Sequence, residues 1–223
     1  MPDRRQQMYK AVVFDMDGVL IDTEKIYRMC WKKNGMSIGI PETEMETVCN
    51  RVAGGNKASN ARVFKDIMGE DFEYLPFRQR TLDLFDEYVS EHGIDIKDHV
   101  ADTLKFLKSR GVKTALATST ERARAKQRLE SVGIYEYFDE KVCGDEIEHG
   151  KPEPEIYLKA CEKLGVDPHD AVAVEDSVNG VISADRAGLF TAMVVDLIPP
   201  NDITDKHADV TYYDIQKICD LFA

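Results

Sequence analysis

Short runs of apolar and β-branched residues alternate along the chain with longer segments whose apolar residues recur at helical spacing. The apolar runs predict strands. These are Lys10–Phe14, Val112–Ala117, Ala171–Val174 and Phe190–Val195, with short edge strands at Val142–Cys143 and Val210–Thr211. The periodic segments predict helices, each followed by a glycine that would end it: Val100–Arg110, Glu121–Val132, Glu153–Leu164 and Val178–Ala187. This alternation is typical of an α/β fold, a parallel sheet with helices on both faces.

One long stretch interrupts the alternation. From about residue 24 to residue 96 we find amphipathic segments such as Ala58–Met68 and Phe77–His92, but no convincing buried strand. The stretch is too long for a loop within a compact domain. We therefore expect a core domain formed by residues 1–23 and 97–223, and a small helical domain formed by residues 24–96.

Two carboxylates directly follow the first predicted strand. Asp15 and Asp17 are two residues apart, and alternate side chains of an extended segment point the same way, so both can enter one site. Gly18 allows the tight backbone that leaves the strand. Two acids in one site repel each other unless a cation lies between them or one takes a proton. The pair therefore indicates a magnesium site, a nucleophile with an acid/base partner, or both; a solvated Asp-Gly turn is the plainer alternative.

Polar clusters also follow the other predicted strands. Thr118-Ser119-Thr120 follows the second, Glu175-Asp176-Ser177 follows the third, and Gly150-Lys151-Pro152 lies between them in the chain. Each cluster alone is explained by a helix cap or a solvated turn. Ligands of open α/β sheets bind beyond the carboxyl ends of the strands, so we expect the clusters to meet. Together they supply carboxylates for a hard cation, hydroxyls and amides for an oxyanion, and a lysine for charge neutralisation.

The composition restricts the classes of partner and the cellular compartment that we expect for the protein. The apolar fraction of 43% and the charged fraction of 31% are ordinary for a soluble globular protein, and the net charge of −12 disfavours a nucleic-acid partner. Five widely spaced cysteines without a Cys-x-x-Cys pair predict buried free thiols rather than a zinc site or disulfides. We find no apolar segment long enough for a signal peptide or a membrane span. We expect a cytoplasmic protein without a membrane partner, and a monomer, since no further extended apolar segment remains.

The four clusters, in this order, resemble the motifs of the haloacid dehalogenase (HAD) superfamily. The resemblance extends from about Lys10 to Val195. Within the superfamily, the chain resembles the subgroup that has a helical cap inserted after the first motif. This subgroup includes β-phosphoglucomutase and many sugar-phosphate phosphatases. The resemblance implies a Rossmann-like core with residues 24–96 as the cap.

The resemblance also implies catalytic roles. Asp15 resembles the nucleophile that forms an aspartyl-phosphate, and Asp17 the general acid that protonates the leaving alcohol and then activates water. Thr118 and the backbone amide of Ser119 resemble the phosphate-binding motif. Lys151 resembles the cation that offsets charge between the nucleophile and the phosphoryl group.

A magnesium site is implied by the same resemblance. Mg²⁺ would be bound by the Asp15 carboxylate, the Asp17 carbonyl and Asp176, with Glu175 assisting. The ion would hold a phosphoryl oxygen and relieve repulsion among the acids.

Asp17 and Tyr27 direct the choice of reaction. Members of the superfamily that cleave carbon–halogen bonds lack an acid at the position of Asp17, so its presence indicates phosphoryl transfer. β-Phosphoglucomutase has a histidine on its first cap helix where this chain has Tyr27. We therefore expect a phosphatase acting on small phosphorylated metabolites, with sugar phosphates favoured. A phosphosugar mutase is the alternative, and a non-catalytic binding or regulatory protein is an alternative of another class.

The cap is expected to select the substrate. Mutase cap loops present an arginine to the distal phosphate, and Arg51 or Lys57 could serve here. Gly54, Gly55 and Asn56 are further candidates, since paired glycines suggest a backbone that bends or approaches a ligand. An ordinary loop between cap helices explains the glycines equally well.

Overall fold

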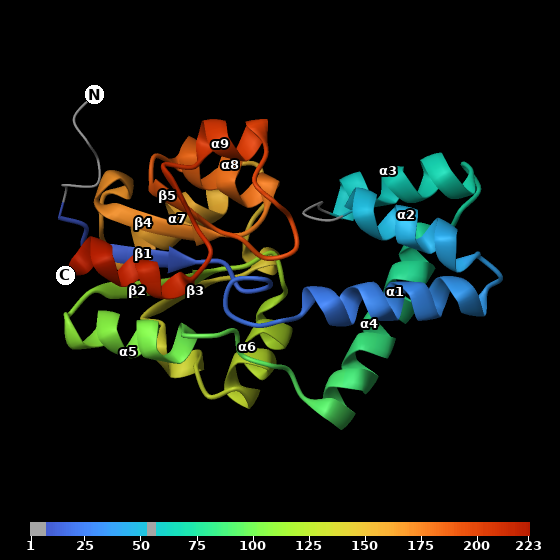
Figure 1. Ribbon diagram of the computed structural model, residues 1–223, viewed down its shortest axis with the longest axis horizontal. Coiled ribbons are helices and arrows are strands. Elements are labelled where there is room, and N and C mark those ends of the chain that lie inside the picture. The colour runs from blue at the N-terminus through green and yellow to red at the C-terminus, as the bar shows by residue number, and fades with distance from the viewer. Residues whose placement is uncertain (1–7, 53–56) are drawn as a thin grey trace. The chain divides into compact units, whose positions relative to one another are not determined.

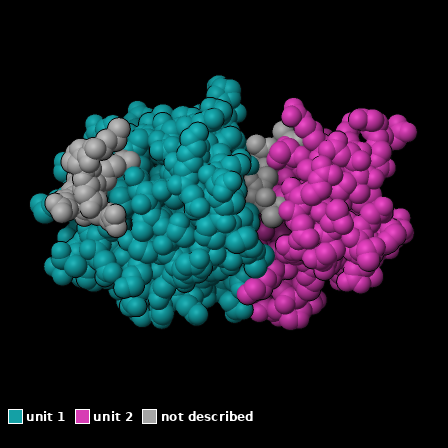
Figure 2. Space-filling view, turned by 45° about the horizontal axis from the view of Figure 1, so that its top comes forward, with its two compact units in different colours: residues 1–22, 95–223 teal, residues 23–94 magenta. Residues whose placement is uncertain are grey.

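The computed structural model describes residues 8–52 and 57–223 and divides the chain into two compact units. Unit 1 comprises residues 1–22 and 95–223, and unit 2 comprises residues 23–94 (Figure 2). The boundaries expected from the sequence were 23/24 and 96/97, one and two residues further along the chain.

Unit 1 is built on a six-stranded, all-parallel sheet in the order β3-β2-β1-β4-β5-β6, which confirms the expected Rossmann-like α/β fold (Figure 1). The strands are β1 Ala11–Phe14, β2 Lys113–Ala117, β3 Glu140–Val142, β4 Ala171–Glu175, β5 Phe190–Val194 and β6 Val210–Tyr212. Every residue of β1, β4 and β5 is buried, as expected of parallel strands covered on both faces. This is why their sequences are continuous apolar runs.

Helices cover both faces of this sheet (Figure 1). They are α5 Val100–Ser109, α6 Arg122–Ser131, α7 Glu155–Leu164, α8 Val178–Ala187 and α9 Asp202–His207, with short 3₁₀ segments η2 Tyr135–Tyr137, η3 Gly144–Glu146, η4 Pro168–Asp170 and η5 Ile215–Phe222. The predicted start of α7 at Glu153 lies two residues before the observed start at Glu155, and Pro154 is the residue that caps the helix.

The two faces of the sheet have separate cores. Odd-numbered residues of β1, among them Val13, share an apolar cluster with Ile156 and Tyr157 of α7. On the other face α5 packs against β2 and η5, and Leu104 and Ile218 are buried there. Because alternate strand residues point to opposite faces, the odd-numbered residues that continue β1 point toward the side of α7.

Unit 2 consists of helices in its described part: α1 Glu24–Ser37, α2 Glu42–Val52, α3 Lys57–Met68 and α4 Tyr74–His92. Phe64 lies at the centre of its core, with ring centroids of Trp31 at 5.6 Å and Phe77 at 4.9 Å. The predicted start of α4 at Phe77 was three residues late. Pro76 belongs to the first helical turn, where the absence of an N–H costs nothing.

The chain leaves unit 1 and returns to it at one place. The Asp22 amide donates to the Asp95 carbonyl at 2.9 Å, and the Lys97 amide donates to the Leu20 carbonyl at 3.0 Å. Ile21 and Ile96 form an antiparallel bridge between these bonds. The segment that leaves unit 1, residues 20–22, and the segment that returns to it, residues 95–97, are therefore paired like two short antiparallel strands.

All five cysteines are free, and four of them are buried, as the sequence predicted. Burial raises the pKa of Cys30, Cys49 and Cys143 to about 11 and that of Cys161 to about 12, which keeps these thiols protonated and unreactive. Within residues 8–52 and 57–223, no helix has both the length and the hydropathy that a membrane crossing requires.

Candidate active site

The register of three neighbouring strands assembles the site. Phe14, the last residue of β1, is level with Leu116 of β2 and Val174 of β4. The residues that follow these three therefore reach the same edge of the sheet, and the Asp15 amide donates to the Val174 carbonyl at 3.0 Å. The clusters that the sequence placed after β1, β2 and β4 meet here as predicted.

Lys151 lies among the acids rather than in a solvated turn. Its Nζ atom donates to Asp15 Oδ1 at 2.6 Å, to Glu175 Oε1 at 2.5 Å and to the Ala117 carbonyl at 3.1 Å. Burial disfavours the charged lysine, but attraction to the two carboxylates outweighs burial and raises the pKa of Lys151. The ammonium group therefore stays charged, and the solvated-turn alternative for this cluster is wrong.

Glu175 has hydrogen-bond partners on both carboxylate oxygens. Besides Lys151, Oε1 accepts from Tyr157 Oη at 2.7 Å. Oε2 accepts from the Ser177 hydroxyl at 3.1 Å and from the Asp176 amide at 3.2 Å. Glu175 is fully buried, so these bonds are what make its charge tolerable. Sequence reasoning missed Tyr157; the available signal was a tyrosine on the buried face of a helix, which requires a partner for its hydroxyl.

Three buried carboxylates form a cluster that suits a hard cation. One oxygen from each of Asp15, Glu175 and Asp176 lies within 4.8 Å of the others. Burial raises the pKa of Asp15 to about 7, Lys151 opposes this, and the charges of Glu175 and Asp17 add to it. Three acids facing one lysine leave an excess of negative charge, and an all-oxygen donor set is the kind that Mg²⁺ prefers. Both Glu175 oxygens already accept hydrogen bonds, from Lys151 and Tyr157 on one side and from Ser177 on the other.

Two glycines bring the backbone close to these carboxylates. Gly18 has a positive φ of 85°, and a Cβ atom there would lie 2.1 Å from Asp176 Oδ2. Gly180, in the first turn of α8, has the Glu175 carboxyl carbon 1.9 Å from the position of a Cβ. Any larger residue at either position would displace an acid of the site.

Asp17 is held by two donors from the segment around α6. Thr120 Oγ1 donates to Asp17 Oδ2 at 2.9 Å, and Arg128 Nη1 donates to Asp17 Oδ1 at 3.2 Å. Sequence reasoning assigned no role to Arg128 and none of its own to Thr120. The overlooked signal was an arginine three residues after Ala125 on the apolar stripe of a helix.

Thr118 and Ser119 do not cap α6, so the capping alternative for this cluster is wrong. The N-cap residue of α6 is Glu121, without a side-chain capping bond. Thr118 is buried, and its Oγ1 accepts from the Thr120 amide at 3.1 Å, whereas Ser119 is exposed. Because Thr118 Oγ1 uses a lone pair for this bond, its hydroxyl hydrogen is available to donate to an anion.

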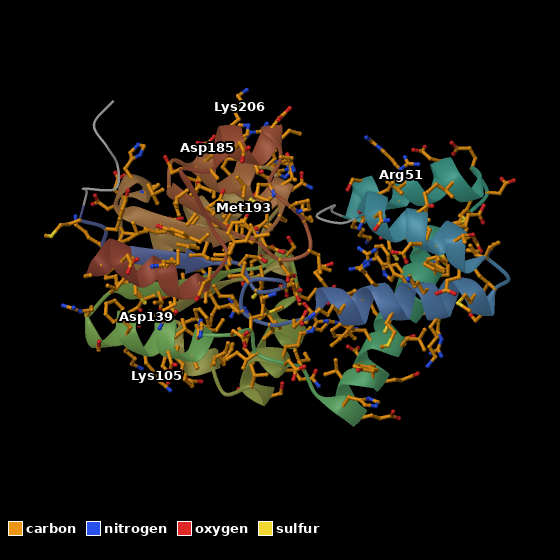
Figure 3. All side chains as sticks on the ribbon, in the orientation of Figure 1. Arg51, Lys105, Asp139, Asp185, Met193 and Lys206 are labelled. Atoms are coloured by element: carbon orange, nitrogen blue, oxygen red, sulfur yellow. The ribbon has the colours of Figure 1, made fainter. Side chains whose placement is uncertain are left out.

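Tyr27 and Arg51, two of the candidates in unit 2, make contacts within that unit. The Tyr27 ring stacks on Phe85 with centroids 4.2 Å apart. Arg51, labelled on α2 in Figure 3, pairs with Asp66 of α3 at 3.0 Å on the surface. The other candidates are Lys57, the exposed first residue of α3, and Gly54, Gly55 and Asn56, which lie outside the described residues.

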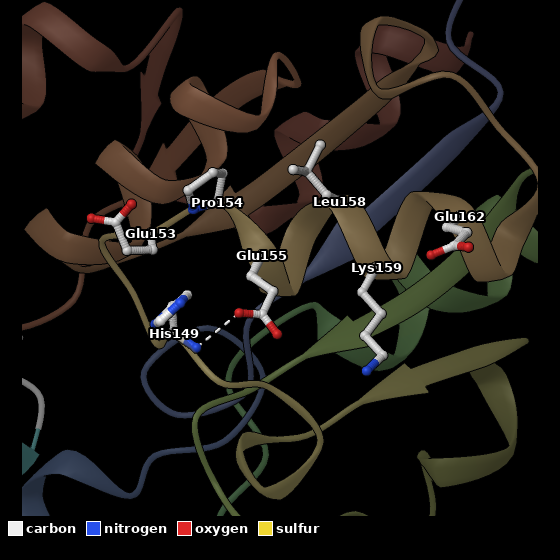
Figure 4. A pocket seen from close by; sticks show the side chains of 7 residues that line it. All are labelled: His149, Glu153, Pro154, Glu155, Leu158, Lys159 and Glu162. Carbon is white, nitrogen blue, oxygen red and sulfur yellow. Dashed lines mark hydrogen bonds between the residues drawn. The ribbon is translucent and has the colours of Figure 1, made fainter.

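The surface beside the Lys151 loop is hollowed along α7, with a volume of about 490 Å³ (Figure 4). Glu155 lines it and accepts hydrogen bonds from the amides of Glu148 and His149 at 2.9 and 2.8 Å. None of the acids of the cluster lines this hollow. Glu155 thus fixes the loop that leads to Lys151, and the hollow is separate from the site.

The sequence matches the haloacid dehalogenase-like hydrolases over residues 9–188. The chain belongs to this family. A phosphorylated carbohydrates phosphatase of Thermotoga maritima is 36% identical over 184 residues, covering 81% of this chain and 82% of the relative. The N-acetylmuramic acid 6-phosphate phosphatase of Pseudomonas aeruginosa is 29% identical and covers 85% and 83%. A Thermotoga maritima crystal structure provisionally named β-phosphoglucomutase has a TM-score of 0.74 and 32% identity, covering 91% and 94%.

Proposed function

We propose that this chain is a Mg²⁺-dependent phosphatase that hydrolyses phosphate monoesters of small metabolites, foremost phosphorylated carbohydrates, through an aspartyl-phosphate. The observation that carries the proposal is the buried Asp15–Lys151 pair at 2.6 Å, with Asp17 two residues further on and Asp176 beside it. Clustered buried acids cost free energy, and chemistry is the reason to retain them. The names of the phosphatase relatives agree with this substrate class.

The first half of the reaction uses Asp15 and Asp17. A carboxylate oxygen of Asp15 attacks phosphorus, the bond between phosphorus and the ester oxygen breaks, and the departing alcohol takes a proton from Asp17. Lys151 offsets the negative charge that gathers between Asp15 and the phosphoryl group. We assign phosphate binding to the Thr118 hydroxyl and the Ser119 amide.

The second half releases phosphate. Asp17, now a carboxylate, accepts a proton from a water molecule whose oxygen attacks phosphorus. The bond between phosphorus and Asp15 breaks, which yields inorganic phosphate and restores the Asp15 carboxylate. The same side chain thus serves first as acid and then as base.

The acid cluster fits Mg²⁺, which the Asp15 and Asp176 carboxylates and the Asp17 carbonyl would bind. The ion would supply positive charge to a phosphoryl oxygen and relieve the repulsion among the acids. We assign to Glu175 the role of holding Lys151, because its oxygens already accept hydrogen bonds.

The test is Asp15→Asn, assayed with p-nitrophenyl phosphate and Mg²⁺. We expect a loss of at least about a thousandfold, since removing a nucleophile abolishes the covalent route. Asp102→Asn is the matched control because Asp102 is 70% exposed on α5. Circular dichroism would verify the fold of both variants. Normal turnover by Asp15→Asn would overturn the assignment, and an inactive wild type would favour the non-catalytic alternative.

A panel of sugar phosphates, nucleotides and other phosphorylated metabolites would identify the substrate class. We expect the highest kcat/KM with phosphorylated carbohydrates, and we propose Tyr27, Arg51 and Lys57 as selecting residues. A phosphosugar mutase is the second candidate, favoured by the 32% identity to the structure named β-phosphoglucomutase. Incubation with β-glucose 1-phosphate and a bisphosphate primer separates the two, because a mutase forms glucose 6-phosphate without matching release of phosphate.

A further inference from the structure

The buried face of α6 contains a charge where an apolar residue would be expected. Its buried residues are Ala125, Arg128 and Leu129, and the Arg128 side chain is only 4% exposed. Removing a guanidinium group from water costs several kcal/mol unless a partner compensates for it. Asp17 is such a partner, since its Oδ1 atom lies 3.2 Å from Arg128 Nη1. A buried arginine on this helix is thus directed at the residue assigned as the acid of the reaction.

The two oxygens of Asp17 are held from different points of the chain. Arg128 reaches Oδ1 from the second turn of α6, and Thr120 reaches Oδ2 from the loop before that helix. One hydrogen bond lets a carboxylate pivot about the bonded oxygen. Two bonds to opposite oxygens fix the direction in which the carboxylate faces, and a catalytic acid must lie within hydrogen-bond reach of the atom that it protonates.

We propose that Arg128 is a positioning residue, which holds the Asp17 side chain in the orientation from which it protonates the leaving alcohol. The proposal rests on the function proposed above. Without Arg128, Asp17 keeps its place in the chain and its bond to Thr120 but loses the bond to Oδ1 that fixes the second oxygen. Since positioning within about 1 Å governs the efficiency of such steps, proton delivery slows while the attack by Asp15 is unaffected.

Leaving groups of different acidity distinguish this role from a merely structural one. The nitrophenolate of p-nitrophenyl phosphate departs without a proton, whereas the alcohol of glycerol 2-phosphate needs one. The value of kcat/KM covers the steps up to departure of the leaving group and excludes the later hydrolysis of the aspartyl-phosphate. The ratio of the two kcat/KM values, glycerol 2-phosphate over p-nitrophenyl phosphate, is also independent of the fraction of enzyme that is folded.

The experiment compares this ratio in the full chain with Mg²⁺. Arg128→Gln is expected to lower it by about tenfold or more, within the range that general acid catalysis contributes. Arg128→Lys should give an intermediate ratio. Lys126→Gln is the matched control, because it removes the same charge from an exposed position of the same helix and should leave the ratio at the wild-type value. If Arg128→Gln does not fold, Arg128→Met carries the same test, since its unbranched apolar side chain suits a buried helix face.

Asp17→Asn, measured in parallel, separates the positioning role of Arg128 from the general-acid role of Asp17. A lowered ratio in Asp17→Asn together with an unchanged ratio in the Arg128 variants overturns the positioning role alone. An unchanged ratio in Asp17→Asn itself contradicts the general-acid role and therefore the proposed mechanism. Equal losses with both substrates in the Arg128 variants mean that Arg128 acts only on the fold.

Discussion

Lys151 donates hydrogen bonds to Asp15 and to Glu175 in a region closed to solvent. Two carboxylates at this depth are tolerated because the ammonium group is present, and the lysine is tolerated because of the carboxylates. Such groups differ from surface ion pairs, whose removal changes little. At the scale of the residue, the stability of the fold therefore depends on the same atoms to which we assign the chemistry.

The variant Lys151→Met should lose both stability and activity. Two buried carboxylates would remain without their cation, and we expect the free energy of unfolding to fall by about 3–5 kcal/mol, with activity abolished. Urea unfolding followed by circular dichroism measures the first effect. Lys105→Met, at a position 61% exposed, is the control and should unfold like wild type. A Lys151→Met protein as stable as wild type would show that the pair contributes nothing to the fold.

The sequence predicted those members of the site that belong to motifs at strand ends. Asp15, Glu175 and Asp176 follow from knowing where strands stop, because parallel strands bring their carboxyl ends to one edge. Lys151 lies before a helix instead, and it was singled out by the family resemblance. Arg128 could not be predicted in this way. Its contact depends on how α6 is rotated against the sheet, which is set by packing between residues far apart in the chain.

At the scale of the element, the strands were predicted better than the helices. Buried parallel strands are continuous apolar runs with clear ends, as Ala171–Glu175 illustrates. The helix α1 was not delimited, because Glu24–Ser37 is mostly polar and its few buried residues, such as Asn34, include polar ones. The 3₁₀ segment η5 was missed altogether, since its conformation depends on packing against α5.

The start of α5 and the start of η5 are joined by an ion pair. His99, which precedes α5 with a positive φ of 62°, has its Nδ1 atom 3.0 Å from both carboxylate oxygens of Asp214. The hydrogen bond and the charge of Asp214 raise the pKa of His99 above 6.5. The folded protein therefore binds this proton more tightly than the unfolded chain does.

The stability from this pair should depend on pH. When folding raises the pKa of a histidine, the resulting stabilisation is fully present below the unfolded pKa of about 6.5. It is lost as the pH rises through the pKa of the folded protein. The difference in Tm between wild type and His99→Gln should thus shrink from about pH 5.5 to about pH 8.5. Differential scanning calorimetry across this range is the measurement. A difference that stays constant or grows with pH contradicts the assignment.

At the scale of the whole molecule, the acid cluster predicts that Mg²⁺ stabilises the folded chain. A ligand at about 100 times its Kd adds about 2.7 kcal/mol to the free energy of unfolding. We expect calorimetry to show a higher Tm with MgCl₂ than with EDTA at equal ionic strength. Asp176→Asn should abolish the increase, and Asp102→Asn should retain it. An increase that persists in Asp176→Asn would place the ion elsewhere.

The paired exit and return of the chain has a consequence for the ancestry of such molecules. Because Asp22 and Asp95 are hydrogen-bonded neighbours, the two ends of residues 23–94 are held together at one place of the core. A segment closed at its base in this way can be lengthened, shortened or exchanged for another while the sheet and its acids keep their places. Recombination at this one junction would give new specificities to an unchanged catalytic core.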